Sequence, residues 1–187
     1  DVIELPLDDV LDINGWDLQK ALRLLYKSNP TLFEWAASPI VYMETEFAGQ
    51  FRNVMNTYFS TKKSLYHYIS MAEGNYREFL RGANVKAKKY FYVMRPVLAY
   101  RWILEKGIPP PMRFTELMAA ELPENLLPEL EHLLELKMNA PEIKEIPRID
   151  VLNEYLDTSI TEIKNLLLDM DDTKKMEWEI LNQMFLK

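Results

Sequence analysis

Along most of the chain, apolar residues recur with the three-to-four-residue spacing that is typical of helices. The first such pattern, formed by Leu18, Leu22 and Leu25, predicts a helix over residues 16–27 that ends before Pro30. The same spacing predicts further helices over residues 31–37, 44–59, 61–81, 85–106, 114–121, 124–138, 150–169 and 173–186.

Three kinds of boundary residue support these predictions. Ser60 is a suitable N-cap for the helix over residues 61–81. Gly107 and the prolines at 109–111 end the helix over residues 85–106, because no helix can continue through them. We therefore expect a mainly α protein.

The front of the chain has a different pattern, which predicts a short β element. Residues 2–13 can form one or two short strands, broken at Pro6, and a turn is predicted at Asn14-Gly15. A single strand or hairpin is not stable alone in water, so we expect the first strand to pair with a sheet that this sequence does not contain.

Composition restricts the class of protein. The chain has 187 residues, of which 48% are hydrophobic, so it can bury a core. It has no cysteine and no apolar run long enough to span a bilayer, so we expect a cytoplasmic protein with no membrane partner. Because the chain begins with Asp1 rather than Met, we also expect an upstream part to be missing.

Charge is distributed unevenly along the chain. Residues 1–49 carry 3 basic and 9 acidic side chains, a net charge of −6. Residues 50–113 carry 12 basic and 3 acidic side chains, a net charge of +9, and residues 114–187 carry 7 and 17, a net charge of −10. The basic middle predicts either a local anion site or simply solvated helix faces.

The strongest interior candidate for an anion site is the segment KAKKYFYVMRPVLAYRW. Lys88, Tyr92 and Arg95 follow one another at i, i+4 and i+7, so they share one helix face. Two cations beside a tyrosine suit a phosphate and a stacked base or ribose. Pro96 leaves the carbonyl of Tyr92 without its helical N–H, which kinks the helix or opens it to a ligand. The alternative is a face that contacts only water.

The segment YHYISMAEGNY contains a second candidate, His67. A lone histidine on such a helix is more often a hydrogen-bonded core residue than a ligand, and His132 lies too far away in sequence for metal spacing. The aromatic residues between positions 58 and 100 form either core or a stacking platform. Phosphate-loop, H-E-x-x-H and G-x-S-x-G motifs do not occur.

Asp12 is the candidate carboxylate at the front of the chain. The string Leu11-Asp12-Ile13 places it between two strand-forming residues, where α/β proteins often hold metal ligands. Asp12 is therefore either a metal ligand or an acid that shapes the turn.

Five strings occur in an order that resembles a known family: DINGWDLQKALRLL, KSNP, EWAASPIVY, HYISMAEGNY and KKYFYVMRPVLAYRWI. The chain is similar here to a bacterial and phage family of predicted nucleotidyltransferases. That family belongs to the DNA polymerase beta-like superfamily and is associated with RNA-repair ligases. The likeness runs from about Val2 to Lys137.

The resemblance implies a catalytic α+β domain followed by helices. Its sheet carries a Gly-Ser turn, an Asp-x-Asp pair and a third carboxylate, to which Asp12 corresponds as a catalytic residue and metal ligand. This sequence lacks the first two motifs. We therefore expect it to be the helical C-terminal two-thirds of such an enzyme, inactive alone. Mg²⁺ or Mn²⁺ is expected only with the missing carboxylates, since one carboxylate cannot hold two metal ions.

By the same resemblance, residues 1–43 end the catalytic domain, residues 44–140 form a helical domain with a basic face, and residues 141–187 form acidic helices. The nucleotide-binding residues are expected to be Lys88, Tyr92, Arg95 and His67. The partners are an NTP and a hydroxyl acceptor, which is an RNA or a small molecule.

Two functions without enzymatic activity remain open. Residues 50–113 can form a helical module that binds nucleic acid or a protein, and the acidic C-terminal helices can act as a scaffold or antitoxin-like element that contacts a basic partner. The oligomeric state is not predicted.

Overall fold

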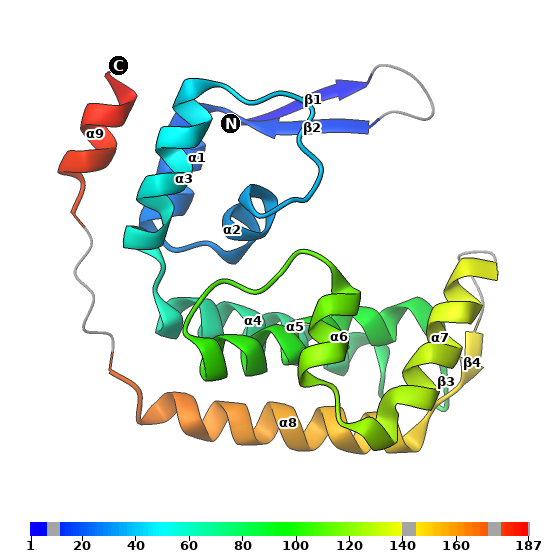
Figure 1. Ribbon diagram of the computed structural model, residues 1–187. Helices are drawn as coiled ribbons and strands as arrows, with labels where there is room; N and C mark the ends of the chain where they lie inside the picture. Colours follow the sequence, from blue (N-terminus) through cyan, green and yellow to red (C-terminus); the bar gives the residue numbers. More distant parts are fainter. Residues whose placement is uncertain (7–11, 140–144, 172–176, 187) are drawn as a thin grey trace.

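The computed structural model describes residues 1–6, 12–139, 145–171 and 177–186 (Figure 1). In these residues the protein is mainly helical, with two small antiparallel sheets, so the predicted fold class is confirmed. None of the described helices has the length and apolar character that crossing a membrane requires.

The N-terminal β element is a hairpin formed within this chain. Strand β1 (Val2–Pro6) pairs antiparallel with β2 (Asp12–Trp16), with Val2 opposite Trp16. We expected the first strand to pair with a sheet outside the sequence. In the described residues its partner is β2 of the same chain, along the whole length of β1.

The turn predicted at Asn14-Gly15 is wrong. Both residues lie inside β2, where Asn14 is opposite Glu4 and Gly15 is opposite Ile3. An Asn-Gly turn needs a strand on each side, but only two residues separate Gly15 from the helix that follows. The connection between the strands, residues 7–11, lies outside the described residues.

Three helices follow the hairpin, and each begins at a side-chain cap. They are α1 (Leu18–Tyr26), α2 (Pro30–Ala36) and α3 (Glu46–Tyr58). Asp17, Asn29 and Thr45 accept hydrogen bonds from the first-turn amides of these helices. The hairpin and these helices form the upper part of the molecule in Figure 1.

A long helix pair forms the centre of the lower part. Helix α4 (Thr61–Phe79) begins at the predicted cap, Ser60, and packs closely along α5 (Ala87–Lys106). Helix α5 ends at Gly107, whose φ of 67° is the left-handed conformation that glycine adopts without strain. Along α5 eleven residues are buried, so this helix is the main core element of the protein.

The remaining elements surround this pair. Helices α6 (Phe114–Glu121) and α7 (Leu127–Asn139), joined through a 3₁₀ turn (Glu124–Leu126), and α8 (Asp150–Leu168) pack around α5 (Figure 1). The short strand β3 (Asn84–Lys86), which connects α4 to α5, pairs with β4 (Glu145–Pro147), which precedes α8. The sequence pattern predicts neither strand. Helix α9 (Glu179–Phe185) returns to α1, beside which the Tyr26 and Trp178 rings stack.

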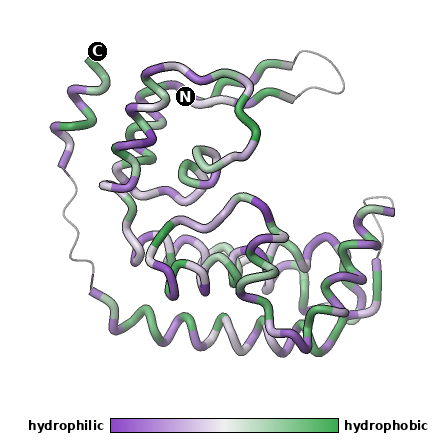
Figure 2. Tube along the Cα trace, viewed as in Figure 1, coloured by the Kyte–Doolittle hydropathy of each residue, from purple (hydrophilic) through white to green (hydrophobic). Residues whose placement is uncertain are grey.

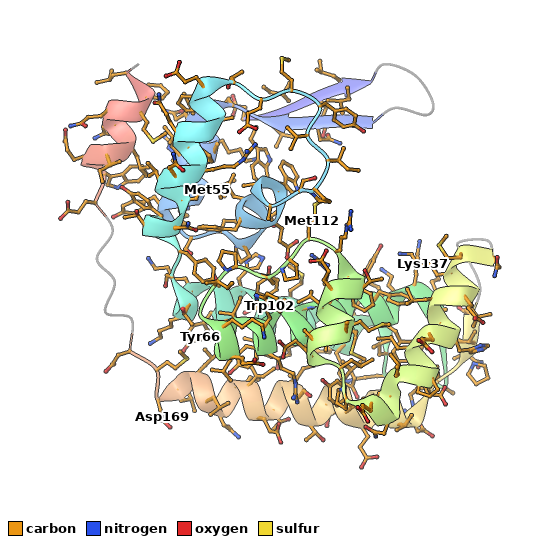
Figure 3. The ribbon with its side chains drawn as sticks, viewed as in Figure 1. Met55, Tyr66, Trp102, Met112, Lys137 and Asp169 are labelled. Atoms are coloured by element: carbon orange, nitrogen blue, oxygen red, sulfur yellow. The ribbon has the colours of Figure 1, made fainter. Side chains whose placement is uncertain are left out.

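Most of the aromatic residues between positions 58 and 100 belong to the core, as one of the two predictions held. Two described tyrosines of this segment, Tyr66 and Tyr92, are exposed instead. Figure 2 shows hydrophilic and hydrophobic positions following one another along α8, and Figure 3 shows Trp102 beneath the connection from α5 to α6. The Trp102 indole donates there to the carbonyl of Pro109, at 3.2 Å. The fully or largely buried aromatic residues are Tyr58, Phe59, Tyr68, Tyr90, Phe91 and Tyr100.

Candidate functional site

The polar face predicted on α5 forms the solvent side of an otherwise buried helix. Lys88 and Arg95 are half-buried, and Tyr92 between them is 47% exposed. Lys89 adds a further cation to this face, because its Nζ lies 4.5 Å from the centre of the Tyr92 ring and 3.5 Å from that of Phe79. We call Lys88, Lys89, Tyr92 and Arg95 the α5 stripe, which combines cations with one exposed aromatic ring.

Pro96 cannot donate a helical hydrogen bond to the backbone carbonyl of Tyr92, and a side chain from α4 donates to that carbonyl instead. The carbonyl of Tyr92 would normally accept the amide N–H of residue 96, which proline lacks. Asn75 of α4 donates to that carbonyl instead, through Nδ2 at 3.4 Å. The helix continues through Pro96 to Lys106, and the carbonyl contacts α4 rather than being left for a ligand.

Arg95 lies at the junction of four segments. Its Nη2 is 3.2 Å from Glu34 Oε2 on α2 and donates to the carbonyl of Pro111, at 3.3 Å, in the connection from α5 to α6. The Tyr68 hydroxyl on α4 donates to the other oxygen of Glu34. We call Glu34, His67, Tyr68 and Arg95 the Arg95 cluster. It joins the upper and lower parts of the molecule.

The protonation states within the Arg95 cluster follow from its burial. Burial lowers the pKa of His67, and the nearby carboxylate of Glu34 opposes this shift only in part. Burial also raises the pKa of the Tyr68 phenol, and the charge of Glu34 adds to the shift. At neutral pH the cluster thus holds a neutral imidazole, a protonated phenol that donates, and one ion pair.

Sequence reasoning did not assign two members of this cluster, Tyr68 and Glu34, to a site. A signal for Glu34 exists, because it is the only charged residue between positions 28 and 43. A single charge in an otherwise uncharged segment that forms a helix must find a partner if that helix is buried. The identity of the partner could not be predicted, since Arg95 lies sixty-one positions away.

The predicted site residues are only partly brought together. His67 and Arg95 both lie beside Glu34, and Tyr92 is one turn from Arg95 on the same helix. Lys88 lies a further turn toward the start of α5. The backbone of Asp12 begins β2 opposite Pro6, but its side chain lies outside the described residues, so its convergence with Arg95 stays a prediction.

A metal site does not form among the residues that the structure describes. No group of three His, Cys, Asp or Glu side chains in these ranges could hold a metal ion. The described side chains therefore do not fit a two-metal centre, which needs several shared carboxylates.

Comparisons with known proteins identify relatives of the sequence. Over residues 1–187, the sequence matches the family described as "RNA repair pathway DNA polymerase beta family". It is 45% identical over 188 residues to the "Uncharacterized protein YcgL" of Bacillus subtilis (strain 168), an alignment that covers all of this sequence and 72% of that protein. No solved structure matches it.

Proposed function

Since the chain belongs to the RNA repair pathway DNA polymerase beta family, we propose that it is part of a nucleotidyltransferase. The reaction would transfer a nucleoside monophosphate from an NTP to a hydroxyl of an RNA or a small molecule. The match over the whole sequence is the observation that carries this proposal, because it includes the α5 stripe and the Arg95 cluster as well as β2.

In this proposal the Arg95 cluster binds the triphosphate. A guanidinium has five N–H donors, and among the described contacts of Arg95 only Nη2 is engaged. The donors on Nε and Nη1 remain for phosphate oxygens, while Glu34 and the Pro111 carbonyl hold the group in one orientation. Pre-orientation of this kind lowers the entropy cost of binding.

Tyr92 and His67 would bind the nucleoside. The exposed ring of Tyr92 offers a face on which a base can stack, and Lys89 against that ring adds positive charge near the phosphates. The neutral imidazole of His67 can donate and accept one hydrogen bond each, which suits a ribose hydroxyl. The proposal gives Asp12 the role of a carboxylate in the catalytic sheet.

The proposal is tested by transfer of label from an α-labelled NTP to an RNA acceptor. The 187-residue chain is compared with a form extended at its N-terminus by a segment that carries the Gly-Ser turn and the Asp-x-Asp pair implied by the resemblance. We expect both to bind NTP in isothermal titration, and only the longer form to transfer label. Asp12→Asn in the longer form should abolish transfer, whereas Asp157→Asn, an exposed carboxylate on α8, should leave it unchanged.

Two results would contradict the proposal. Equal turnover by both forms would show that further carboxylates are not needed. Binding of RNA without any transfer, unaffected by Asp12→Asn and steeply weakened by salt, would favour the non-enzymatic module over residues 50–113.

A further inference from the structure

The first 49 residues are acidic, yet all their cations gather on one helix face. Lys20, Arg23 and Lys27 are the only basic residues in this part of the chain. They follow one another at i, i+3 and i+7 on α1 and its C-cap, so they form one stripe. We call these three residues the α1 basic stripe.

The α1 basic stripe lines a groove. The groove has a volume of about 430 Å³ and lies between α1 and the start of the chain, where Asp1 and Val2 form its other wall. Arg23 and Lys27 are exposed and Lys20 is half-buried. No ion pair of these three cations with a carboxylate is present in the described part of the structure. The acidic residue that lines the groove is Asp1.

The helix dipole explains only part of this arrangement. Cations near the C-terminus of a helix are favoured, which accounts for Arg23 and Lys27. Lys20 lies in the first turn, where a cation is disfavoured. Its Nζ instead lies 5.5 Å from the centre of the Trp16 ring, so Lys20 connects the stripe with an aromatic surface.

That aromatic surface is a second groove on the neighbouring side of α1. The groove has a volume of about 440 Å³, and its walls come from α1, α2, α3 and the end of β2. The rings of Trp16 and Trp35 stack in it with centroids 4.2 Å apart, and Trp35 is still 42% exposed. Its other aromatic lining residues are Phe47 and Phe51.

We propose that these two adjoining grooves bind a single-stranded RNA, with phosphates on the α1 basic stripe and an unpaired base on Trp35. A cationic track beside aromatic rings is the arrangement by which proteins hold single strands. A duplex keeps its bases stacked inside and cannot use Trp35 in this way. The charges also fit, because the three cations of the stripe line one groove and the phosphates of a nucleic acid are anions. The inference rests on the proposed function only in choosing RNA as the strand.

The test measures RNA binding by the 187-residue chain without any NTP. Fluorescence anisotropy follows a labelled single-stranded RNA of about 12 nucleotides, within the range of known single-strand sites. Each phosphate contact with a single strand contributes about 0.7 to the slope of log K against log salt. Three contacts predict a slope of about −2. Arg23→Gln with Lys27→Gln should reduce it to about −0.7 and weaken binding about 25-fold at about 0.1 M salt.

A matched control uses two exposed arginines at the end of α4. Arg77→Gln with Arg81→Gln makes the same change in net charge and should leave the affinity within about twofold. Trp35→Ala should weaken binding about five- to 150-fold, the range found for loss of one stacked base. Thermal melts check that each variant is folded. The substituted arginines and lysine are exposed and lie outside the buried core.

Four results would overturn the inference. The first two are an equal loss of RNA affinity in the α1 and α4 double variants, and no loss of affinity in Trp35→Ala. The other two are binding of a duplex of the same sequence as tightly as the single strand, and competition by an acidic peptide as strong as that by unlabelled single-stranded RNA. A chain that binds RNA as expected but takes no part in nucleotide transfer would refute the proposed function alone. A chain that transfers nucleotide but binds RNA independently of α1 would refute this inference alone.

Discussion

The ion pair between Glu34 and Arg95 should contribute measurably to the stability of the fold. Its atoms are 3.2 Å apart, and the two side chains are 18% and 25% exposed. At an effective dielectric constant of about 20, this separation gives a Coulomb energy of about 5 kcal/mol. Desolvation and the ordering of both side chains offset most of it, so we expect a net coupling of about 1–2 kcal/mol.

A double-mutant cycle measures this coupling directly. Glu34→Ala, Arg95→Ala and the double variant are unfolded in urea, and the coupling is the part of the destabilisation that is not additive. Arg95→Ala alone should cost about 1–3 kcal/mol, because it leaves Glu34 with only the Tyr68 hydroxyl as a donor. For a chain of this size the melting temperature should fall by about 2–4 °C per kcal/mol.

Arg77→Ala is the matched control, since Arg77 is exposed on α4. It should change the free energy of unfolding by no more than about 0.5 kcal/mol. A coupling below about 0.5 kcal/mol between Glu34 and Arg95 would refute the reasoning. Arg95 would then not depend on Glu34 for its position, and pre-orientation by that carboxylate could not be part of nucleotide binding.

Two further predictions concern buried polar groups. Burial lowers the pKa of His67 in the folded protein from its usual 6.5. Below about pH 6.5 the unfolded state therefore binds a proton at His67 more readily than the folded state does. The free energy of unfolding should fall as the pH drops from about 7.5 to 5.5. Urea midpoints should show a weaker fall in His67→Gln than in the unsubstituted protein, and an equal fall in both would assign the effect elsewhere. Tyr90→Phe should cost about 1–3 kcal/mol, because the buried Tyr90 hydroxyl donates to Asn153 Oδ1 at 2.7 Å. Tyr100→Phe should be neutral or stabilising, since its buried hydroxyl has no partner among the described residues, and a similar loss in both variants would contradict this account.

The helices could be predicted because their signals are local. Ser60 and Gly107 mark helix ends through their own chemistry, and the apolar period is read within a few turns. The pairing of β3 with β4 could not be predicted. Each strand has three residues, and the partners lie about sixty positions apart, so neither pattern nor turn chemistry indicates them.

In the candidate site, too, local features could be predicted and contacts between distant segments could not. The shared face of Tyr92 and Arg95 follows from helical phase alone. The contact between Arg95 and Glu34 depends on how α2 packs against α4 and α5, which local pattern does not encode. The Asn14-Gly15 prediction failed for a related reason, since a turn dipeptide becomes part of a strand when an upstream segment pairs with it.

The two cationic surfaces should differ in their response to salt, and this difference separates their roles. Arg95 is half-buried and already paired with a carboxylate, so it attracts distant anions little and acts through geometry at short range. Arg23 and Lys27 are exposed and unpaired with any described carboxylate, so their attraction is long-ranged and is screened within about 10 Å at 0.1 M salt. Raising salt should therefore release RNA held by the α1 basic stripe while affecting the contact between Arg95 and an NTP less. If NTP and RNA affinities fell in parallel with salt, the two surfaces would not be acting in these different ways.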